Sequence, residues 1–216
     1  IFGMHQRDDD YIFSPIPLEA YKEVESSQTM FLLLGGSSKY KDQANYLGIK
    51  NIQFLPTTAS LENIHKFLNT LDVYAHGRKD GEQCSTAIIE AMSHGLPLVS
   101  HTAPSMGQEE QIGDGGLVVK NVSEYANTMK RFMEDKLFFQ LCSKNSLKRY
   151  KSHYQLEVII SKYIEIIEEA VVFKSPSQIL KKFLIFESIV VSIRVTFIKL
   201  LKRVLKKLKK ELKVLV

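Results

Sequence analysis

The chain is poor in cysteine, with only Cys84 and Cys142 among its 216 residues. Two cysteines argue against a disulfide framework, and their spacing fits neither a metal site nor a redox motif. We therefore expect a reducing compartment, the cytoplasm. The sequence also lacks a signal-peptide pattern and an uncharged run of about 18 residues, because Glu187 and Arg194 interrupt its most apolar segment. A spanning helix is therefore not expected.

The net charge of +5 is unevenly distributed along the chain. Residues 177–216 contain eleven Lys or Arg and two Glu, a net charge of +9, which leaves 18 basic and 22 acidic residues, a net of −4, for residues 1–176. A body with net negative charge argues against a nucleic-acid-binding domain. It can still bind a diphosphate locally, through a helix N-terminus and one or two arginines.

Short apolar runs alternate with longer amphipathic segments, and no hairpin signal separates them. This alternation predicts an α/β fold, a Rossmann-like doubly wound parallel sheet, with helices after residue 123. The expected strands are 1–4, 30–34, 52–55, 72–76, 98–101 and 117–119. The expected helices are one ending near residue 27, then 41–47, 61–69 and 87–92.

In parallel α/β sheets, ligands bind where the strands end at their carboxyl edge. The loops expected there contain many of the glycines, short hydroxyl side chains and charged residues. They are residues 3–10, 35–38, 56–58, 77–83 and 102–107. These loops are therefore the predicted ligand-binding region.

The segment DGEQCSTAIIEAMSHGLPLVSH, residues 80–101, has a distinctive pair of carboxylates. Glu82 precedes a short helix and Glu90 lies about two turns inside it. A helix N-terminus binds anions through free backbone N–H groups, and carboxylates accept hydrogen bonds from hydroxyls. This layout suits a nucleotide-sugar, which has hydroxyls at both ends and a diphosphate between them.

At these residues the chain resembles the donor-binding half of retaining GT-B glycosyltransferases, family 4 (glycosyl transferases group 1) in particular. The family signature is Glu, seven residues, Glu, Ala-Met and Gly-x-Pro-x-Val. Here it is Glu82, QCSTAII, Glu90, AM and GLPLV. The resemblance covers roughly residues 1–172 and implies a nucleotide-sugar-binding domain there, followed by a basic amphipathic tail over residues 173–216. Because the chain begins without methionine, we expect that an N-terminal, acceptor-binding domain is missing.

The resemblance implies roles for individual residues. Glu90 would accept hydrogen bonds from the ribose hydroxyls, and Glu82 would contact a hydroxyl of the donor sugar and so take part in catalysis. Without a ligand, Glu90 would be an ordinary surface glutamate and Glu82 a favourable charge near a helix N-terminus. Backbone N–H groups would hold the distal phosphate and sugar hydroxyls at Gln83, Cys84, Ser85 and Thr86. Ser85 is also a plausible helix N-cap.

The diphosphate contacts depart from the family pattern. Family members place an arginine and then a lysine against the diphosphate, whereas here Arg7 is followed by Asp8-Asp9-Asp10 and no lysine. Arg7 is the predicted catalytic cation, and Arg78 or Lys79 are alternatives. The loop glycines Gly3 and Gly35 and the base-side Pro56 complete the predicted donor-binding set.

Two further patterns have ordinary alternatives. The acidic triplet suits Mg²⁺ or Mn²⁺ in principle, but an acid run preceding a helix explains it better, and no metal or cofactor is expected. His76 and His101 end strands beside the predicted site, where a buried, hydrogen-bonded histidine is the commoner outcome. Glu109 and Glu110 resemble the family's Pro-Glu loop, without its proline.

The tail combines its positive charge with an apolar stripe at helical spacing. An interfacial helix attracted to anionic lipid fits this pattern, which would place the protein at the inner face of a membrane; a coiled-coil seam is the alternative. The stripe is formed by Phe197, Leu201, Val204 or Leu205, Leu208, Leu212 and Leu215.

The predicted function is that of the donor domain of a retaining hexosyltransferase. It would bind a nucleoside-diphosphate sugar and, as an isolated fragment, transfer nothing to the unknown glycan or lipid-linked acceptor. Two alternatives remain open: a nucleotide-sugar epimerase of the same fold, and a non-catalytic module that binds a nucleotide-sugar or docks at membranes.

Overall fold

The structure is a computed structural model in which residues 1–172 are described. It contains two compact units, residues Ile1–Lys162 and residues Tyr163–Val216. The first unit holds the sheet and every predicted site residue. The amphipathic tail predicted over residues 173–216 lies outside the described residues.

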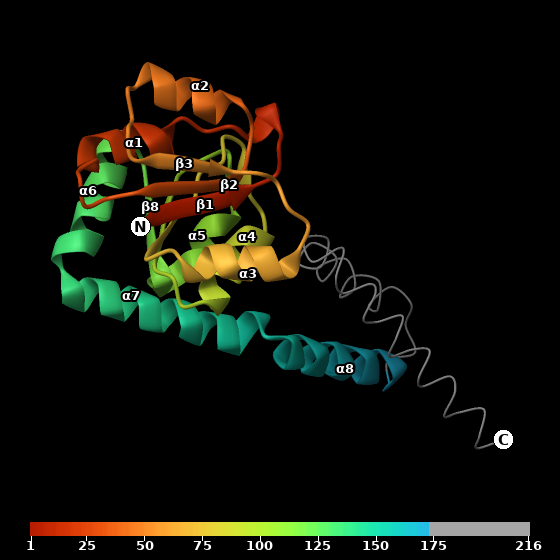
Figure 1. The fold of residues 1–216 in the computed structure, drawn as a ribbon. Coiled ribbons are helices and arrows are strands. Elements are labelled where there is room, and N and C mark those ends of the chain that lie inside the picture. Colours follow the sequence, from red (N-terminus) through yellow and green to blue (C-terminus); the bar gives the residue numbers. More distant parts are fainter. Residues whose placement is uncertain (173–216) are drawn as a thin grey trace. The chain divides into compact units, whose positions relative to one another are not determined.

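Six parallel strands form the central sheet, in the order β3-β2-β1-β4-β6-β8 (Figure 1). Most of their residues are apolar and buried, as parallel strands covered on both faces require, whereas the edge strand β3 has no fully buried residue. The strands are β1 Phe2–Gln6, β2 Phe31–Gly35, β3 Ile52–Leu55, β4 Val73–Ala75, β6 Leu98–His101 and β8 Gly116–Val119. The predicted doubly wound parallel sheet is confirmed.

Helices cover both faces of this sheet, with α1, α2 and α6 on one face and α3, α4 and α5 on the other (Figure 1). Helix α1 packs against α6, and α7 packs against both α4 and α6. Their bounds are α1 Ile16–Val24, α2 Lys39–Tyr46, α3 Leu61–Asn69, α4 Thr86–Ser93, α5 Gly107–Ile112, α6 Val122–Glu134, α7 Lys136–Arg149 and α8 Leu156–Val172.

Four α-helices begin at a residue whose side chain accepts a hydrogen bond from a backbone N–H of the first turn. These N-caps are Ser60 before α3, Ser85 before α4, Asn121 before α6 and Asp135 before α7. Such caps satisfy N–H groups that lack a partner within the helix. At the other end of α4, Gly95 follows the C-cap residue His94 and has a φ of 67°, a conformation that favours glycine.

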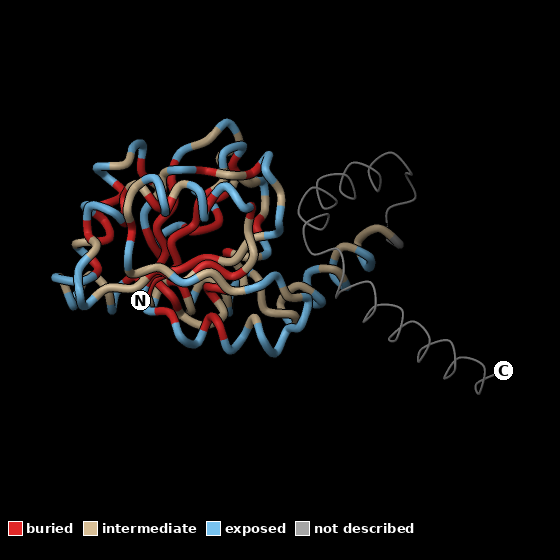
Figure 2. The backbone as a smooth tube through the Cα atoms, turned by 45° about the horizontal axis from the view of Figure 1, so that its top comes forward, coloured by how far each residue is buried: buried red, intermediate tan, exposed pale blue. Residues whose placement is uncertain are grey.

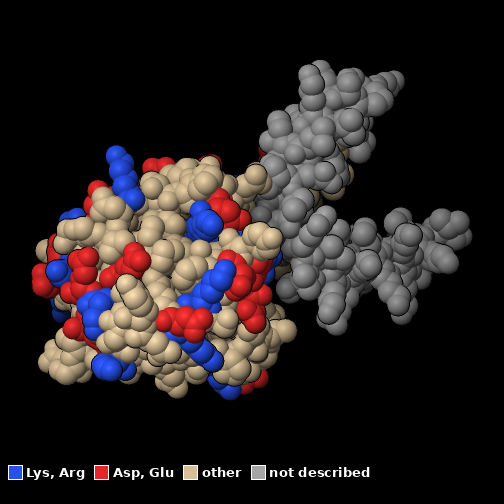
Figure 3. Space-filling model, turned by 90° about the horizontal axis from the view of Figure 1, so that it is seen from above, with Lys and Arg blue, Asp and Glu red and all other residues tan. Residues whose placement is uncertain are grey.

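The core lies between the sheet and its two helical layers, where the tube in Figure 2 is mostly buried. Fully buried aromatic side chains of the sheet and of helices α1 and α6 help to fill it, namely Phe31, Tyr74, Tyr21 and Tyr125. On the surface seen in Figure 3, basic and acidic side chains are interspersed over the first unit. Among residues 1–172, no helix is both long and apolar enough to cross a bilayer.

Three features differ from the sequence-based expectation. Strand β1 continues to Gln6 rather than ending at Met4, so the loop after it begins at Arg7. A second, two-stranded parallel sheet pairs β5, Gly81–Glu82, with β7, Ser105–Met106, within regions predicted as loops. Short 3-10 helices lie at Asp10–Ile12 and Gly113–Gly115, and a π-helical turn at Tyr150–Tyr154 separates α7 from α8.

Candidate nucleotide-sugar site

The carboxyl edge of the sheet gathers the loops after β1, β2 and β4 together with the N-terminus of α4. Strands β1, β2 and β4 are parallel neighbours, so their carboxyl ends face the same way. The side chain of Gln6 ties them together, since its Nε2 donates to the Gly77 carbonyl at 3.0 Å and its Oε1 accepts from the Tyr40 hydroxyl at 3.1 Å.

Glu90, on α4, reaches this edge and meets a histidine of the central strand. Its Oε2 lies 2.7 Å from His5 Nε2, and the two side chains are 25% and 12% exposed. Glu90 is therefore half-buried in a polar contact, unlike a freely solvated glutamate. Sequence reasoning missed His5 because it ended the strand at Met4; a strand extended by two residues would have placed His5 beside the site.

Glu82 lies on β5, where a histidine and an arginine surround its carboxylate. Its Oε1 is 3.3 Å from Arg78 Nη1 and 3.9 Å from His76 Nε2, and the side chain is 17% exposed. Burial tends to raise the pKa of Glu82, but the neighbouring side chains of His76 and Arg78 outweigh it, so the pKa is lowered. Glu82 is thus a partly buried carboxylate whose neighbours favour its ionised form.

The two arginines of the site differ in environment. Arg78 is 20% exposed and donates two hydrogen bonds to Asp80, of 2.6 and 3.0 Å, in addition to its contact with Glu82. Arg7 is 66% exposed and pairs with Asp9 at 2.8 Å. Arg78 is therefore built into the wall of the site, whereas Arg7 lies at its surface.

The N-terminus of α4 is positioned by two buried glutamines of α5. Gln111 accepts from the Ser85 N–H at 2.8 Å and donates to the Ser85 carbonyl at 2.9 Å. Gln108 accepts from the Glu82 N–H at 3.1 Å and donates to the His101 carbonyl at 3.1 Å. The glutamates between them, Glu109 and Glu110, are exposed. The glutamines, which sequence reasoning did not single out, hold the segment that carries the motif.

The remaining motif residues vary in exposure. Gln83 and Thr86 are exposed, Cys84 is half-buried, and Ser85 is buried as the N-cap of α4, with its Oγ accepting from the Ile88 N–H at 3.4 Å. The capping role of Ser85 is confirmed. Phosphate or sugar binding by the backbone N–H groups of these four residues stays a prediction.

The acidic triplet makes structural contacts through two of its three carboxylates. Asp9 caps the 3-10 helix at Tyr11 N, 3.0 Å away, and pairs with Arg7. Asp10 accepts a hydrogen bond from Ser37, which lowers the pKa of Asp10, and pairs with Lys39 at 3.4 Å. An acid run preceding a helix is what the structure contains. In residues 1–172, no three His, Cys, Asp or Glu side chains are grouped as a metal site would need.

The predicted loop residues lie in different places. Gly35 ends β2 with a φ of 73°, and a Cβ there would overlap the carbonyl oxygen of Gln6. Pro56 is exposed just after β3. Gly3 lies inside β1 rather than in the loop, which corrects the expected loop boundary. A Cβ on Gly3 would come within 2.6 Å of the Leu32 carbonyl, so the glycine permits close packing of β1 against β2.

Both strand-ending histidines are buried and hydrogen-bonded. His101 Nδ1 is 2.9 Å from the Thr102 carbonyl and its Nε2 is 2.7 Å from Ser14 Oγ, and burial lowers the pKa of His101. His76 Nδ1 is 2.9 Å from Ser100 Oγ, while its Nε2 faces Glu82. His101 is a satisfied core histidine, as expected, and His76 belongs to the wall behind Glu82.

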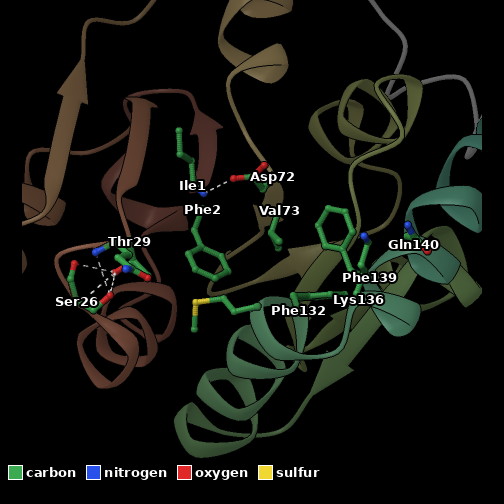
Figure 4. A pocket seen from close by; sticks show the side chains of 12 residues that line it. Ile1, Phe2, Ser26, Thr29, Asp72, Val73, Phe132, Lys136, Phe139 and Gln140 are labelled. Atoms are coloured by element: carbon green, nitrogen blue, oxygen red, sulfur yellow. Dashed lines mark hydrogen bonds and ion pairs between the residues drawn. The ribbon is translucent and has the colours of Figure 1, made fainter.

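A separate hollow of about 720 Å³ opens at the opposite, amino-terminal edge of the sheet (Figure 4). Phe2, Val73, Phe132 and Phe139 contribute apolar surface to it, and the Ile1 ammonium pairs with Asp72 at its rim, 2.5 Å away. None of the predicted site residues lines this hollow. The polar groups described above belong to the carboxyl edge alone.

The chain matches the family described as glycosyl transferases group 1 over residues 15–135, which is more than half of its length. No curated protein sequence matches it.

Solved structures share its fold at low sequence identity. The Anabaena HepE structure with UDP-glucose has a TM-score of 0.67 and 21% identity, and the match covers 78% of this chain and 48% of HepE. Sucrose-phosphate synthase of Thermosynechococcus elongatus has a TM-score of 0.66 and 17% identity over 79% of this chain and 45% of the synthase.

A third structure is a C-terminal domain. That of a glycosyl transferase group 1 family protein from Francisella tularensis has a TM-score of 0.60 and 16% identity over 72% of this chain and 86% of the domain. This chain therefore spans about half the length of HepE and of the synthase, and most of a C-terminal domain. These similarities confirm the predicted Rossmann-like fold of a GT-B C-terminal domain.

Proposed function

The chain belongs to the glycosyl transferases group 1 family, and we propose that it binds a nucleoside-diphosphate sugar at the carboxyl edge of its sheet. The observation that carries this proposal is the placement of Glu82 and Glu90. Both carboxylates are partly buried at one edge, around the N-terminus of α4, and each faces a nitrogen-bearing side chain. The HepE structures contain UDP and UDP-glucose, which supports this class of donor.

In the proposed complex Glu90 accepts hydrogen bonds from the ribose hydroxyls and Glu82 accepts one from the donor sugar. The N-terminus of α4 binds the distal phosphate through its backbone N–H groups and its dipole. Catalysis then consists of positioning the sugar and stabilising the departing diphosphate. Arg7 supplies charge to the diphosphate from the exposed loop after β1, and Arg78 adds charge from behind Glu82.

We further propose that the reaction is retaining transfer of a hexosyl group to an acceptor held outside this chain. The chain spans about half the length of HepE, so a second domain would carry the acceptor site. The isolated chain would bind the donor without transferring it. The basic tail over residues 177–216 would hold the protein at an anionic membrane surface near a glycan or lipid-linked acceptor.

Calorimetry of the 216-residue chain against UDP-, GDP- and ADP-sugars tests the proposal. Glu90→Gln should remove a charge-assisted hydrogen bond and weaken binding about 10- to 150-fold. Glu134→Gln, at an exposed position of α6, is the matched control and should bind as the parent does. If the Glu90 variant binds as tightly as the parent, Glu90 is not a donor ligand.

The same measurement tests Arg7. Arg7→Ala should weaken binding of the nucleoside diphosphate far more than binding of the nucleoside, because only the diphosphate carries the charge that Arg7 would contact. Equal losses for both ligands would argue against a phosphate role.

Product analysis of the sugar without added acceptor separates donor binding from epimerisation, since only an epimerase would change the sugar.

A further inference from the structure

Glu90 is not held by its own helix alone, because its carboxylate is anchored on the central strand of the sheet. The contact joins His5 Nε2 of β1 to Glu90 Oε2 of α4 over 2.7 Å and a sequence separation of 85 residues. An ionised carboxylate only accepts hydrogen bonds, so Nε2 carries the hydrogen and donates it. Within residues 1–172, Glu90 Oε1 has no such partner, so it is the oxygen left for a ligand.

The imidazole of His5 is itself fixed from several sides. The rings of Phe67 and Tyr74 meet it edge-on, with centroids 6.1 and 5.6 Å away. The Tyr74 hydroxyl lies 3.2 Å from His5 Nδ1 and from the His5 carbonyl, and it accepts from the His5 N–H at 3.3 Å. Strand β1 also lies between β2 and β4, in the interior of the sheet.

Tyr74 contacts the second ring nitrogen of His5. Its side chain is fully buried, and burial raises the pKa of the phenol, so the hydroxyl keeps its hydrogen. A neutral imidazole that donates from Nε2 to Glu90 has an acceptor at Nδ1, and the hydroxyl hydrogen of Tyr74 lies between this nitrogen and the His5 carbonyl, both 3.2 Å from its oxygen. The three groups thus form a chain of hydrogen bonds from Tyr74 through His5 to Glu90.

We propose that His5, oriented by Tyr74, is a positioning residue that fixes the Glu90 carboxylate so that its second oxygen meets the donor ribose. This inference rests on the proposed function. The energetic reason is preorganisation: a carboxylate already held in its binding rotamer loses less conformational freedom when the ligand arrives. Without His5, Glu90 would have to be ordered by the ligand itself.

The test compares two substitutions at His5 by calorimetry on the full chain, with UDP, GDP and ADP as probes. His5→Leu removes the hydrogen-bond donor to Glu90 while keeping an apolar side chain against Phe67 and Tyr74. It should weaken binding of the nucleoside diphosphate about 10-fold. His5→Gln places an amide N–H near the position of Nε2 and should recover most of that affinity. His153→Ala, at an exposed position, is the control and should leave affinity unchanged.

Two readouts separate positioning from a general structural effect. In a Glu90→Ala background, His5→Leu should cause no further loss, because the carboxylate through which it acts is gone. With the 2′,3′-dideoxy form of the same nucleotide, His5→Leu should bind as the parent does. The inference would be overturned if His5→Leu lost as much affinity in the Glu90→Ala background, or with the dideoxy nucleotide, as it loses in the parent chain with the ordinary nucleotide. It would also be overturned if His5→Leu bound the diphosphate that the parent binds with unchanged affinity.

The outcome also distinguishes this inference from the proposed function. A parent chain that binds none of the three diphosphates contradicts both. A parent that binds one of them, loses affinity with Glu90→Gln and keeps it with His5→Leu supports the donor site and rejects only the role of His5.

Discussion

At the scale of single residues, the Glu82 carboxylate is stabilised in its charged form by its neighbours. Burial alone would favour the neutral acid, but His76 and Arg78 lower the pKa of Glu82 below its ordinary value of 4.5. Because the folded-state pKa is depressed, ionised Glu82 stabilises the fold above about pH 4.5, and this stabilisation is lost as the pH falls through the lower, folded-state pKa.

This linkage predicts a pH-dependent cost for Glu82→Gln. The variant should have a smaller free energy of unfolding than the parent at pH 7, and the difference should narrow as the pH falls below about 4.5, where the parent carboxyl also becomes neutral. Urea unfolding at a series of pH values measures it. Exposed Glu134→Gln serves as the control for loss of one negative charge, and a cost of Glu82→Gln that stays constant down to pH 3 would contradict the prediction.

At the scale of elements, helix α5 supports the motif without belonging to it. Gln108 and Gln111 are 1% and 3% exposed and bond to the backbone of Glu82, Ser85 and His101. Their spacing of three places both side chains on one face of the helix. Buried backbone groups need such partners, because an unsatisfied one costs about 1–3 kcal/mol.

Gln111→Ala should therefore destabilise the chain by about 2–4 kcal/mol, since it leaves two buried groups of Ser85 without their partner. Glu109→Ala, at an exposed position of the same helix, should change stability by less than about 0.5 kcal/mol. Chemical unfolding of both variants gives the comparison. Similar small effects for the two would show that water replaces Gln111 at the start of α4.

Element prediction succeeded where the signal was local. Strands β3 and β6 and helix α3 have the predicted bounds, and the helices after residue 123 are confirmed as far as residue 172. The pairing of β5 with β7 could not be predicted in this way. It joins two short polar segments about 24 residues apart, and neither has the apolar alternation that marks a strand.

At the scale of the whole molecule, the net charge of the C-terminal segment differs in sign from that of the rest of the sequence. The net charge of +9 belongs to residues 177–216, and the remainder carries −4. Each basic residue close to an anionic surface contributes about 1 kcal/mol, and the attraction is screened within a Debye length of ~8 Å at physiological salt. Peripheral membrane binding through the tail remains a prediction.

Vesicle co-sedimentation tests this prediction on the full chain and on a chain that ends at Pro176. Only the full chain should sediment with anionic vesicles, and added salt should weaken the binding, because it screens the attraction. Vesicles of neutral lipid are the control and should retain much less protein. Should the full chain ignore anionic vesicles and form a discrete oligomer that truncation abolishes, the tail is a coiled coil.

The sequence alone determined the class of fold and the family. Alternating apolar runs and amphipathic segments are local signals, and so is the Glu82 to Val99 motif, whose residues are consecutive. Only the tertiary structure decided how the site is built. His5 meets Glu90 across 85 residues, and Gln111 meets Ser85 across 26, because parallel strands bring distant loops to one edge. Such contacts depend on packing in three dimensions, and no local pattern in the sequence records them.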